Sequence, residues 1–336
     1  MKDEKCNILI YGILSSGSSA LVDLLLEYNN VNVIPGEFDD FRAPGLVADQ
    51  LCYDKSVDFS NLIDTLLQNT SKRRLIYNIF PIFKWKMYTI TGIKGRFISS
   101  LIRIRQLFLL EKLNKELKSN ISFEDKIRLA NHWISDVGNI NNKNKALNVY
   151  NQPIEIRNDD HIWRAVFNPC KLICVYRDPK DQLADIVKRG FLSVSFGGPY
   201  MTIAGLNSET IYGSNRRGAI KFHIDAMKKR FEWIDAMKKK LDPDKFLLID
   251  FEGLVHNYDL YKSAIEDFIG GIKNNHKDKM KVFNPDISKE NIGIYKNILS
   301  RDELDSLTEF DHWYKNMVVN NQISTKTSKI MSSSNI

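Results

Sequence analysis

The segment ILIYGILSSGSSALVDLLLEY, residues 8–28, constrains the fold more than any other part of the chain. Its apolar start predicts a buried strand, and the apolar positions that recur after Ser18 predict an amphipathic helix. A serine-rich turn joins the two. Gly12 and Gly17 have the spacing of a Walker A loop, but Ser18 stands where that motif has its lysine. The chain therefore begins with the outline of a phosphate-binding loop that lacks the usual charge.

Short apolar runs alternate with helical patterns along the rest of the chain. The runs rich in β-branched residues are 5–14, 31–35, 146–150, 171–176 and 245–250, and helical patterns follow the last two at 180–189 and 258–269. Strands that alternate with helices favour a parallel sheet covered on both faces. We predict an α/β protein with a P-loop-like three-layer α/β/α fold, a central parallel sheet and a helical insertion.

We expect a single domain over residues 1–320. A basic helical insertion is predicted at about 61–140, because strands resume after it and linker composition is missing. The tail, residues 321–336, has the polar composition of a disordered segment.

The positive charge is concentrated in the insertion. Residues 72–118 hold twelve Lys or Arg against Glu111 and Glu116, whereas the chain as a whole carries +7. Aromatic and aliphatic residues are interleaved with these cations, as in helices that bind membrane surfaces. We expect peripheral membrane contact here and no nucleic acid partner, because no nucleic-acid motif appears. The alternative is a helical layer that packs on the sheet and leaves its charges in water.

Localisation and metal content follow from two further features. The first residues, MKDEKCN, lack the basic start and apolar stretch of a signal peptide, so we expect a cytoplasmic protein, with the inner face of the membrane as its contact. The four cysteines are scattered, and no spacing of Cys or His predicts a metal site.

A second motif, KLICVYRDPKDQLADIVKRG, residues 171–190, predicts a strand that ends at Arg177 and a helix that starts after Asp178 and Pro179. Ligands of open α/β sheets bind at the carboxyl ends of the strands, where Arg177 would lie. Asp250 ends another strand and has the position of a Walker B acid. A kinase or an ATPase would nevertheless need the lysine that this loop lacks. The loop therefore better fits a co-substrate that donates a group other than the γ-phosphoryl.

Four ordered segments resemble the sulfotransferases that use 3′-phosphoadenosine 5′-phosphosulfate (PAPS). They are SSGSSAL at 15–21, YRDPKDQLAD at 176–185, the strand, turn and helix at 246–270, and SKENIGIYKNILS at 288–300. The stretch at 31–42 is most similar to the carbohydrate branch of that family, which sulfates capsule, lipopolysaccharide or heparan-like glycans.

The resemblance implies a nucleotide site. Its loop residues would hold the 5′-phosphosulfate, Arg177 the 3′-phosphate, and the late segment would fold over the nucleotide. Asp185 occupies the place of the family's phosphate-binding serine, so Ser193 or Ser195 would substitute, or Asp185 would point away. The residues implied to bind the nucleotide are Ser15, Ser16, Gly17, Ser18, Ser19, Arg177, Asp185, Ser193, Ser288, Lys289 and Lys296.

Two catalytic roles also follow from the resemblance. Glu37 matches the family's general base, and a carboxylate can accept the proton of an attacking hydroxyl. Many relatives have Lys or Arg where this chain has Ser15. Such a cation stabilises the departing oxygen, so something must replace it. We expect Arg42 in that role, with Lys180 as a weaker candidate.

The predicted function is transfer of a sulfuryl group from PAPS to a hydroxyl of a carbohydrate or lipid-linked glycan, without a metal. Two alternatives stay open. One is a nucleotide-dependent kinase or ATPase with a degenerate loop, and the other is a non-catalytic nucleotide-binding protein at the membrane.

Overall fold

A computed structural model describes residues 6–12, 14–43, 46–53, 92–140, 145–190, 192 and 215–319. The chain divides into two compact units. Met1–Leu9 and Tyr28–Lys171 form the first, and Ile10–Glu27 and Leu172–Ile336 form the second. Ser193 and the tail at 321–336 lie outside the described residues, as does the insertion before residue 92.

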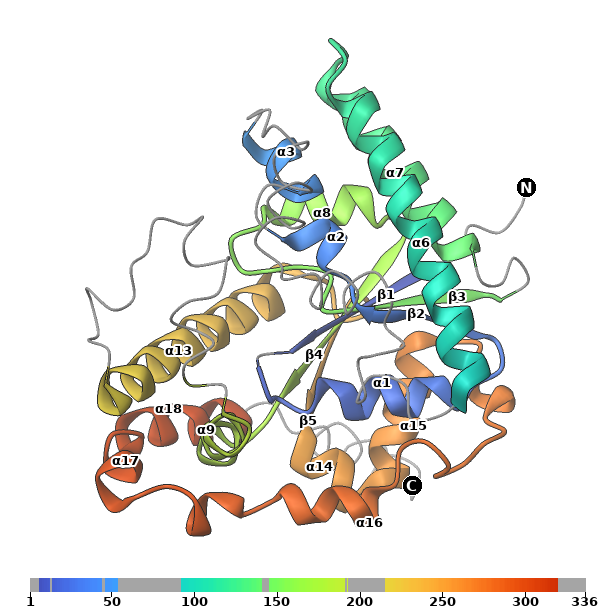
Figure 1. The fold of residues 1–336 in the computed structure, drawn as a ribbon. Helices are drawn as coiled ribbons and strands as arrows, with labels where there is room; N and C mark the ends of the chain where they lie inside the picture. The colour runs from blue at the N-terminus through green and yellow to red at the C-terminus, as the bar shows by residue number, and fades with distance from the viewer. Residues whose placement is uncertain are drawn as a thin grey trace, which may run out of the picture. The chain divides into compact units, whose positions relative to one another are not determined.

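Five strands form one sheet in the order β2-β3-β1-β4-β5 (Figure 1). Their bounds are β1 Cys6–Gly12, β2 Val31–Glu37, β3 Leu147–Asn151, β4 Cys170–Tyr176 and β5 Phe246–Asp250. The sheet is parallel, with β2 paired to β3 and β4 paired to β5 in that direction, so the predicted α/β class is confirmed. Strand β2 is longer than predicted, because it continues past Pro35 and Gly36 through a register shift between Val33 and Glu37.

The helices fall into the two units. The first unit contains α2 (Asp39–Arg42), α3 (Val47–Tyr53), α6 (Gly92–Leu117), α7 (Phe123–Asn139) and α8 (Asp160–Val166). The second contains α1 (Ser18–Leu26), α9 (Pro179–Lys188), α13 (Arg216–Lys240), α14 (Phe251–His256), α15 (Tyr258–Ile269), α16 (Pro285–Ser288), α17 (Arg301–Asp305) and α18 (Thr308–Val319), with short 3₁₀ turns η2 (Lys273–Asn275), η3 (Lys289–Asn291) and η4 (Ile294–Asn297).

The strand order places β1 at the centre of the sheet. The chain passes from β1 to β2 on one side and later reaches β4 and β5 on the other. The direction of winding therefore changes at β1, and open α/β sheets bind ligands outside the carboxyl ends of the strands at such a point. The serine-rich loop, which joins β1 to α1, begins at the carboxyl end of β1.

A row of buried asparagines crosses three strands of the first unit. Asn32 on β2 donates to the side chain of Asn148 on β3 at 3.0 Å, and Asn148 donates to Asn7 on β1 at 3.4 Å. The ends of the row reach backbone carbonyls at Gly138 and Phe167. A Cβ added to Gly138 would lie 2.3 Å from the amide of Asn148, so helix α7 has a glycine where it meets the row.

Aromatic packing holds α2 in the first unit. Phe38 and Phe41 are buried and contact Phe167 with ring centroids 6.3 and 5.1 Å apart. Phe38 also stacks on Trp133 of α7. These contacts anchor the short segment that begins at Glu37 and ends at Arg42, so both of its charged ends have fixed positions.

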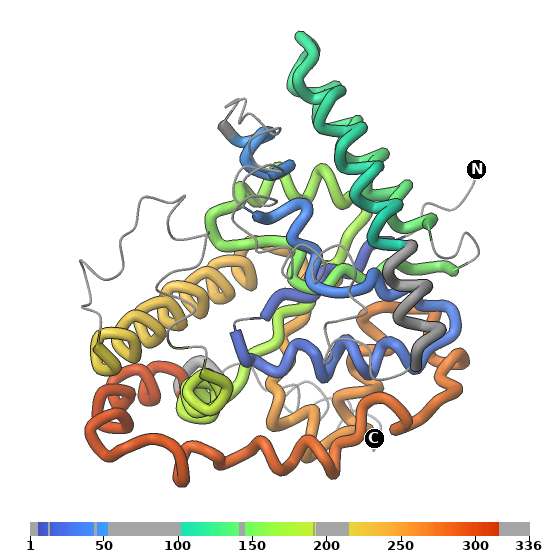
Figure 2. Tube along the Cα trace, viewed as in Figure 1, coloured from blue at the N-terminus to red at the C-terminus, as the bar shows by residue number. Residues whose placement is uncertain are grey.

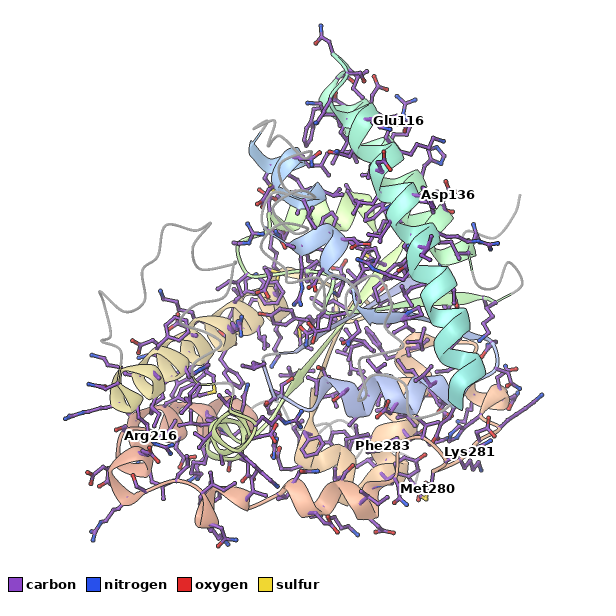
Figure 3. All side chains as sticks on the ribbon, viewed as in Figure 1. Glu116, Asp136, Arg216, Met280, Lys281 and Phe283 are labelled. Atoms are coloured by element: carbon purple, nitrogen blue, oxygen red, sulfur yellow. The ribbon has the colours of Figure 1, made fainter. Side chains whose placement is uncertain are left out.

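The far end of α1 is anchored by a buried carboxylate in the second unit. Glu27 accepts hydrogen bonds from the backbone N–H groups of Met280, Val282 and Phe283, and its Oε2 lies 2.6 Å from Nε2 of His276. Figure 3 labels Met280 and Phe283 on the loop concerned. Helix α1 is therefore fixed at the end opposite to the serine-rich loop.

The insertion is helical where the structure describes it. Helices α6 and α7 lie side by side (Figure 1), and α7 has a strongly apolar side that includes the buried Trp133, Ile134 and Val137. Within the described residues, no helix combines the length and the apolar character needed to cross a membrane.

Candidate functional site

The loop between β1 and α1 is wrapped tightly around two glycines. Gly17 has a φ of +86°, and a Cβ there would lie 2.4 Å from the ring of Phe251. A Cβ on Gly12 would lie 2.4 Å from Oγ of Ser16 and 2.6 Å from Cβ of Ser18. Both glycines are therefore required, one for its backbone conformation and both for the close approach.

The first turn of α1 has features that suit an anion. Gly17 is its N-cap and has no side chain to accept from the backbone N–H groups of the turn, and the turn contains no acidic residue. These N–H groups and the helix dipole favour a negative charge. Ser19 is exposed, whereas Ser16 is buried, and Oγ of Ser16 has no hydrogen-bond partner among the described residues. A buried hydroxyl without a partner has a donor to offer to a ligand.

Arg177, just after β4, and Gln182 of α9 both hold the loop between β1 and α1. Nη1 of Arg177 donates to the carbonyl of Ser15 at 3.3 Å, and Nε2 of Gln182 donates to the carbonyl of Leu14 at 2.5 Å. The guanidinium also lies over the ring of Phe251, 5.2 Å from its centroid. The loop's shape therefore depends on side chains more than 150 residues away in the sequence.

Arg177 is only 3% exposed, in keeping with its place at the end of β4. Nη2 donates to the carbonyl of Asn291, while Nε has no partner among the described residues. Burial lowers the pKa of Arg177, and nearby carboxylates, first Asp185, partly oppose that shift. The group is still a strong base and carries its charge at neutral pH.

Asp185 does not point away from Arg177. Its Oδ2 lies 3.9 Å from Nη1 of Arg177 and 2.8 Å from Nε of Arg189, and the carboxylate is buried. The interaction is therefore with two guanidinium groups. Ser193 and Ser195, the two residues that could substitute for it, are outside the described residues.

Residues 289–297, called the strap below, lie beside α9 (Figure 2). The carboxylate of Asp181 accepts the N–H of Gly293 at 2.7 Å and the N–H of Tyr295 at 3.1 Å. Of the residues expected to bind a nucleotide, Lys296 is exposed on the strap, and Lys289 pairs with Asp286 at 2.8 Å. Ser288 ends α16 immediately before the strap.

Lys180, the weaker cation candidate, is engaged elsewhere. Its Nζ lies 3.0 Å from Asp311 on α18 and 3.8 Å from Asp178, and it also covers the ring of Tyr295. The ammonium thus ties α9 to α18 and to the strap. Its charge is compensated by two carboxylates.

Asp250 is used as a helix cap. One oxygen accepts the N–H of Gly253 in α14, and the other accepts the hydroxyl of Tyr261. Both carboxylate oxygens are therefore committed within the fold, unlike those of a Walker B acid that holds a metal. No cluster of three or more His, Cys, Asp or Glu suited to a metal ion occurs in the described parts of the chain.

The first unit contains Glu37 and Arg42, the two predicted catalytic residues. Nη2 of Arg42 lies 2.6 Å from Oε2 of Glu37, and the same guanidinium pairs with Asp39 at 2.7 Å and with Glu155 at 3.2 Å. Burial alone would lower the pKa of Arg42, but these carboxylates outweigh it and raise the pKa. Glu37 is 54% exposed and so can meet a ligand, whereas Arg42 is a cation surrounded by acids.

Two further arginines fix the same segment. Arg103 of α6 donates from both terminal nitrogens to Asp40, at 2.5 and 2.6 Å, and Asp40 is buried. Arg157 pairs with Asp49 and donates to the carbonyl of Arg42. One cation of the basic insertion thus has a structural task, since it stabilises α2 through an ion pair that is shielded from water.

Three residues that contact the loop or the strap were not predicted from the sequence as site residues: Asp181, Gln182 and Phe251. Asp181 and Gln182 are polar residues on the buried side of α9. A break in an apolar helix face is a signal of polar contacts, although it does not identify the partners.

Comparisons with known proteins give weak likenesses only. No protein-family model matches the chain, and no curated protein matches it. The sulfotransferase domain of the Synechococcus PCC 7002 olefin synthase aligns at 14% identity and a TM-score of 0.41, over 92% of this chain and 96% of that one. The sulfotransferase domain from the curacin biosynthetic pathway aligns at 14% and 0.43, over 91% and 98%. Sulfotransferase STF1 of Mycobacterium tuberculosis H37Rv aligns at 12% and 0.41, over 86% and 76%. Likenesses of this size identify neither a family nor a reaction.

The half-buried carboxyl of Glu252 predicts a pH dependence of stability. Burial, followed by the neighbouring carboxylates of Asp250 and Asp178, raises its pKa from 4.5 to about 7, although the N–H of Asp178 opposes the shift. Between these values the unfolded chain has lost a proton that the folded protein keeps. The free energy of unfolding should therefore fall by on the order of 2 kcal/mol as the pH rises from 4.5 to 8.

The variant Glu252→Gln should lose this slope, because an amide keeps the acceptor without the charge. Urea unfolding of both proteins across that pH range gives the difference between their free energies. Glu309→Gln is the control, since the Glu309 carboxyl is 94% exposed. Parallel curves for wild type and Glu252→Gln would contradict the prediction.

Proposed function

We propose that this chain is a PAPS-dependent sulfotransferase that transfers a sulfuryl group to a hydroxyl of a carbohydrate or lipid-linked glycan. The observation that carries the proposal is a serine-rich loop without lysine, held by a hydrogen bond from the buried Arg177. The motif resemblance supplies the identity of the donor. The reaction and its acceptor are inferred from these two sources together.

The residues present fit an anionic donor. The backbone N–H groups at the start of α1, the serine hydroxyls and the unpartnered Oγ of Ser16 are all donors toward a 5′-phosphosulfate. Nε of Arg177 is a further unpartnered donor, suited to the 3′-phosphate. Its terminal nitrogens are engaged by the carbonyls of Ser15 and Asn291, so a bound phosphate would share or replace those bonds.

The proposed chemistry is an in-line displacement at sulfur. PAPS supplies an activated sulfuryl group whose bond to the phosphate oxygen is broken as the bond to the acceptor oxygen forms. Glu37 would accept the proton of the attacking hydroxyl, a role that its exposed carboxylate permits. The oxygen that departs stays on the nucleotide as part of its 5′-phosphate.

Arg42 is assigned a different role from the one expected from the sequence. With three carboxylates around it, this guanidinium has little charge to offer to a departing oxygen. We assign it to the orientation of Glu37. Lys180 is also paired, so the dipole and N–H groups of α1 are the best source of stabilisation for the developing charge.

The kinase alternative is less well supported. A kinase would need a cation on the β- and γ-phosphates and an acid free to hold magnesium. The loop has Ser18 at the first position, and the oxygens of Asp250 are engaged by Gly253 and Tyr261.

Membrane contact through residues 72–118 is a further part of the proposal. On α6, Arg105, Phe108, Lys112 and Lys115 recur at three- and four-residue spacing and are exposed, with Phe108 at 67%. An exposed aromatic residue among cations suits the interface of an anionic bilayer. The contact would bring a lipid-linked acceptor to the enzyme.

Calorimetric titration with 3′-phosphoadenosine 5′-phosphate tests the donor site. We expect binding that does not depend on magnesium and that weakens about 30- to 100-fold in Arg177→Ala, because a charge-assisted pair is lost. Arg301→Ala on the exposed start of α17 is the control. Binding of magnesium-ATP alone would overturn the proposal and favour the kinase.

Glu37→Gln tests the base. Turnover with PAPS should fall 10²- to 10⁴-fold while affinity for the bisphosphate is unchanged, because only proton transfer is removed. Asp39→Asn is the matched control, since Asp39 also pairs with Arg42 but has no proposed chemistry. Equal losses in the two variants would show that Glu37 acts only through Arg42.

Sedimentation with vesicles tests the membrane contact. Binding to vesicles that contain phosphatidylserine should weaken about tenfold in the double variant Arg105→Glu and Phe108→Ala, since each basic residue near the surface contributes roughly 1 kcal/mol. Lys239→Ala on α13 is the control. Equal binding of wild type to neutral and anionic vesicles would remove this part of the proposal.

A further inference from the structure

Arg177 and the first turn of α9 contact two segments that are far apart in the sequence. Toward the serine-rich loop, Arg177 and Gln182 donate to the carbonyls of Ser15 and Leu14. Toward the strap, Arg177 donates to the carbonyl of Asn291 and Asp181 accepts two N–H groups. Each of these contacts joins a side chain of Arg177 or of α9 to the backbone of the other segment.

Asp181 is the centre of the strap contact. The residue is 2% exposed, and its two oxygens each accept one backbone N–H, from Gly293 and from Tyr295. Bonds from N–H groups to a carboxylate are about twice as strong as those between neutral groups, and a buried carboxylate is costly without them. Hence neither the carboxylate nor the strap can move without leaving the other unpaired.

The strap has the conformation that this contact requires. Gly293 has a φ of +78° and is the N-cap of η4, which contains Tyr295 and Lys296. A left-handed residue lets the two N–H groups point to one carboxylate, and glycine adopts it without strain. Asp181 therefore fixes the backbone on either side of Ile294, directly before Lys296.

We infer that Asp181 is a positioning residue that holds the strap in its nucleotide-binding conformation before the nucleotide arrives. This inference rests on the proposed function for the identity of the ligand. Asp181 contacts no reacting atom and acts through residues 293–296. Because the strap is ordered in advance, binding loses less conformational entropy, and affinity is higher than for a free strap.

Hydrogen–deuterium exchange of the protein without ligand is the direct test. In Asp181→Asn, the amides of Gly293 and Tyr295 should exchange at least tenfold faster, because an amide side chain has one acceptor oxygen and no charge. Exchange in the five strands should stay as in wild type. Asp235→Asn is the matched control, since Asp235 pairs only with Lys239 on the exposed face of α13 among the described side chains.

Titration with the bisphosphate gives the functional readout. Affinity should fall about tenfold or more in Asp181→Asn and return in part in Asp181→Glu, which keeps the charge. Gly293→Ala tests the same contact by a change in the strap instead of in Asp181. A Cβ there meets nothing within 4 Å but strains the φ of +78°, so the variant should fold and show the same two effects.

The outcomes separate the inference from the proposed function. If wild type does not bind the bisphosphate, the proposed function fails, and the positioning of a nucleotide fails with it, whatever the exchange data show. If wild type binds and both Asp181→Asn and Gly293→Ala bind as tightly, with unchanged exchange at residues 293 and 295, Asp181 has no positioning role.

Discussion

The second unit depends on three buried polar residues, of which one follows β4 directly and two lie in the first turn of α9. A serine-rich loop and a strap of short 3₁₀ turns contain few apolar side chains with which to pack. Their shapes must come from hydrogen bonds to the backbone, and Arg177, Asp181 and Gln182 provide them. Because these three residues are themselves buried, their own polar groups require such partners. These side chains and the two loops therefore stabilise each other, and a substitution in one should destabilise the other.

Charge in the two units follows one pattern. Arg42, Arg103 and Arg177 each face one or more carboxylates, and each is at least partly buried. Pairing fixes the geometry of a guanidinium but reduces what it can offer to a ligand. A reaction supported by this chain would thus draw on backbone N–H groups, hydroxyls and the helix dipole more than on free cations.

The strands and the nearby helices could be predicted from the sequence because their signals are local. The apolar run at 171–176 differs from β4 by one residue, and the helix predicted at 258–269 has the bounds of α15. The pairing of Arg42 with Glu155 could not be predicted in this way, since 113 residues separate them. The contact between Asp181 and Gly293 could not be predicted either. The motif around Asp181 contains the polar residue but does not identify the backbone N–H group that it binds. Pro35 and Gly36 concealed the length of β2 because neither favours a strand.

The asparagine row has a consequence for states of the chain that are not folded correctly. A strand that slips by one residue turns all of its side chains to the other face of the sheet. Apolar residues tolerate many wrong neighbours, but Asn7, Asn32 and Asn148 would each leave amide groups unpaired away from water. The row therefore raises the free energy of misregistered sheets more than it lowers that of the native one. During folding, it would act as a check on strand alignment before the first unit closes.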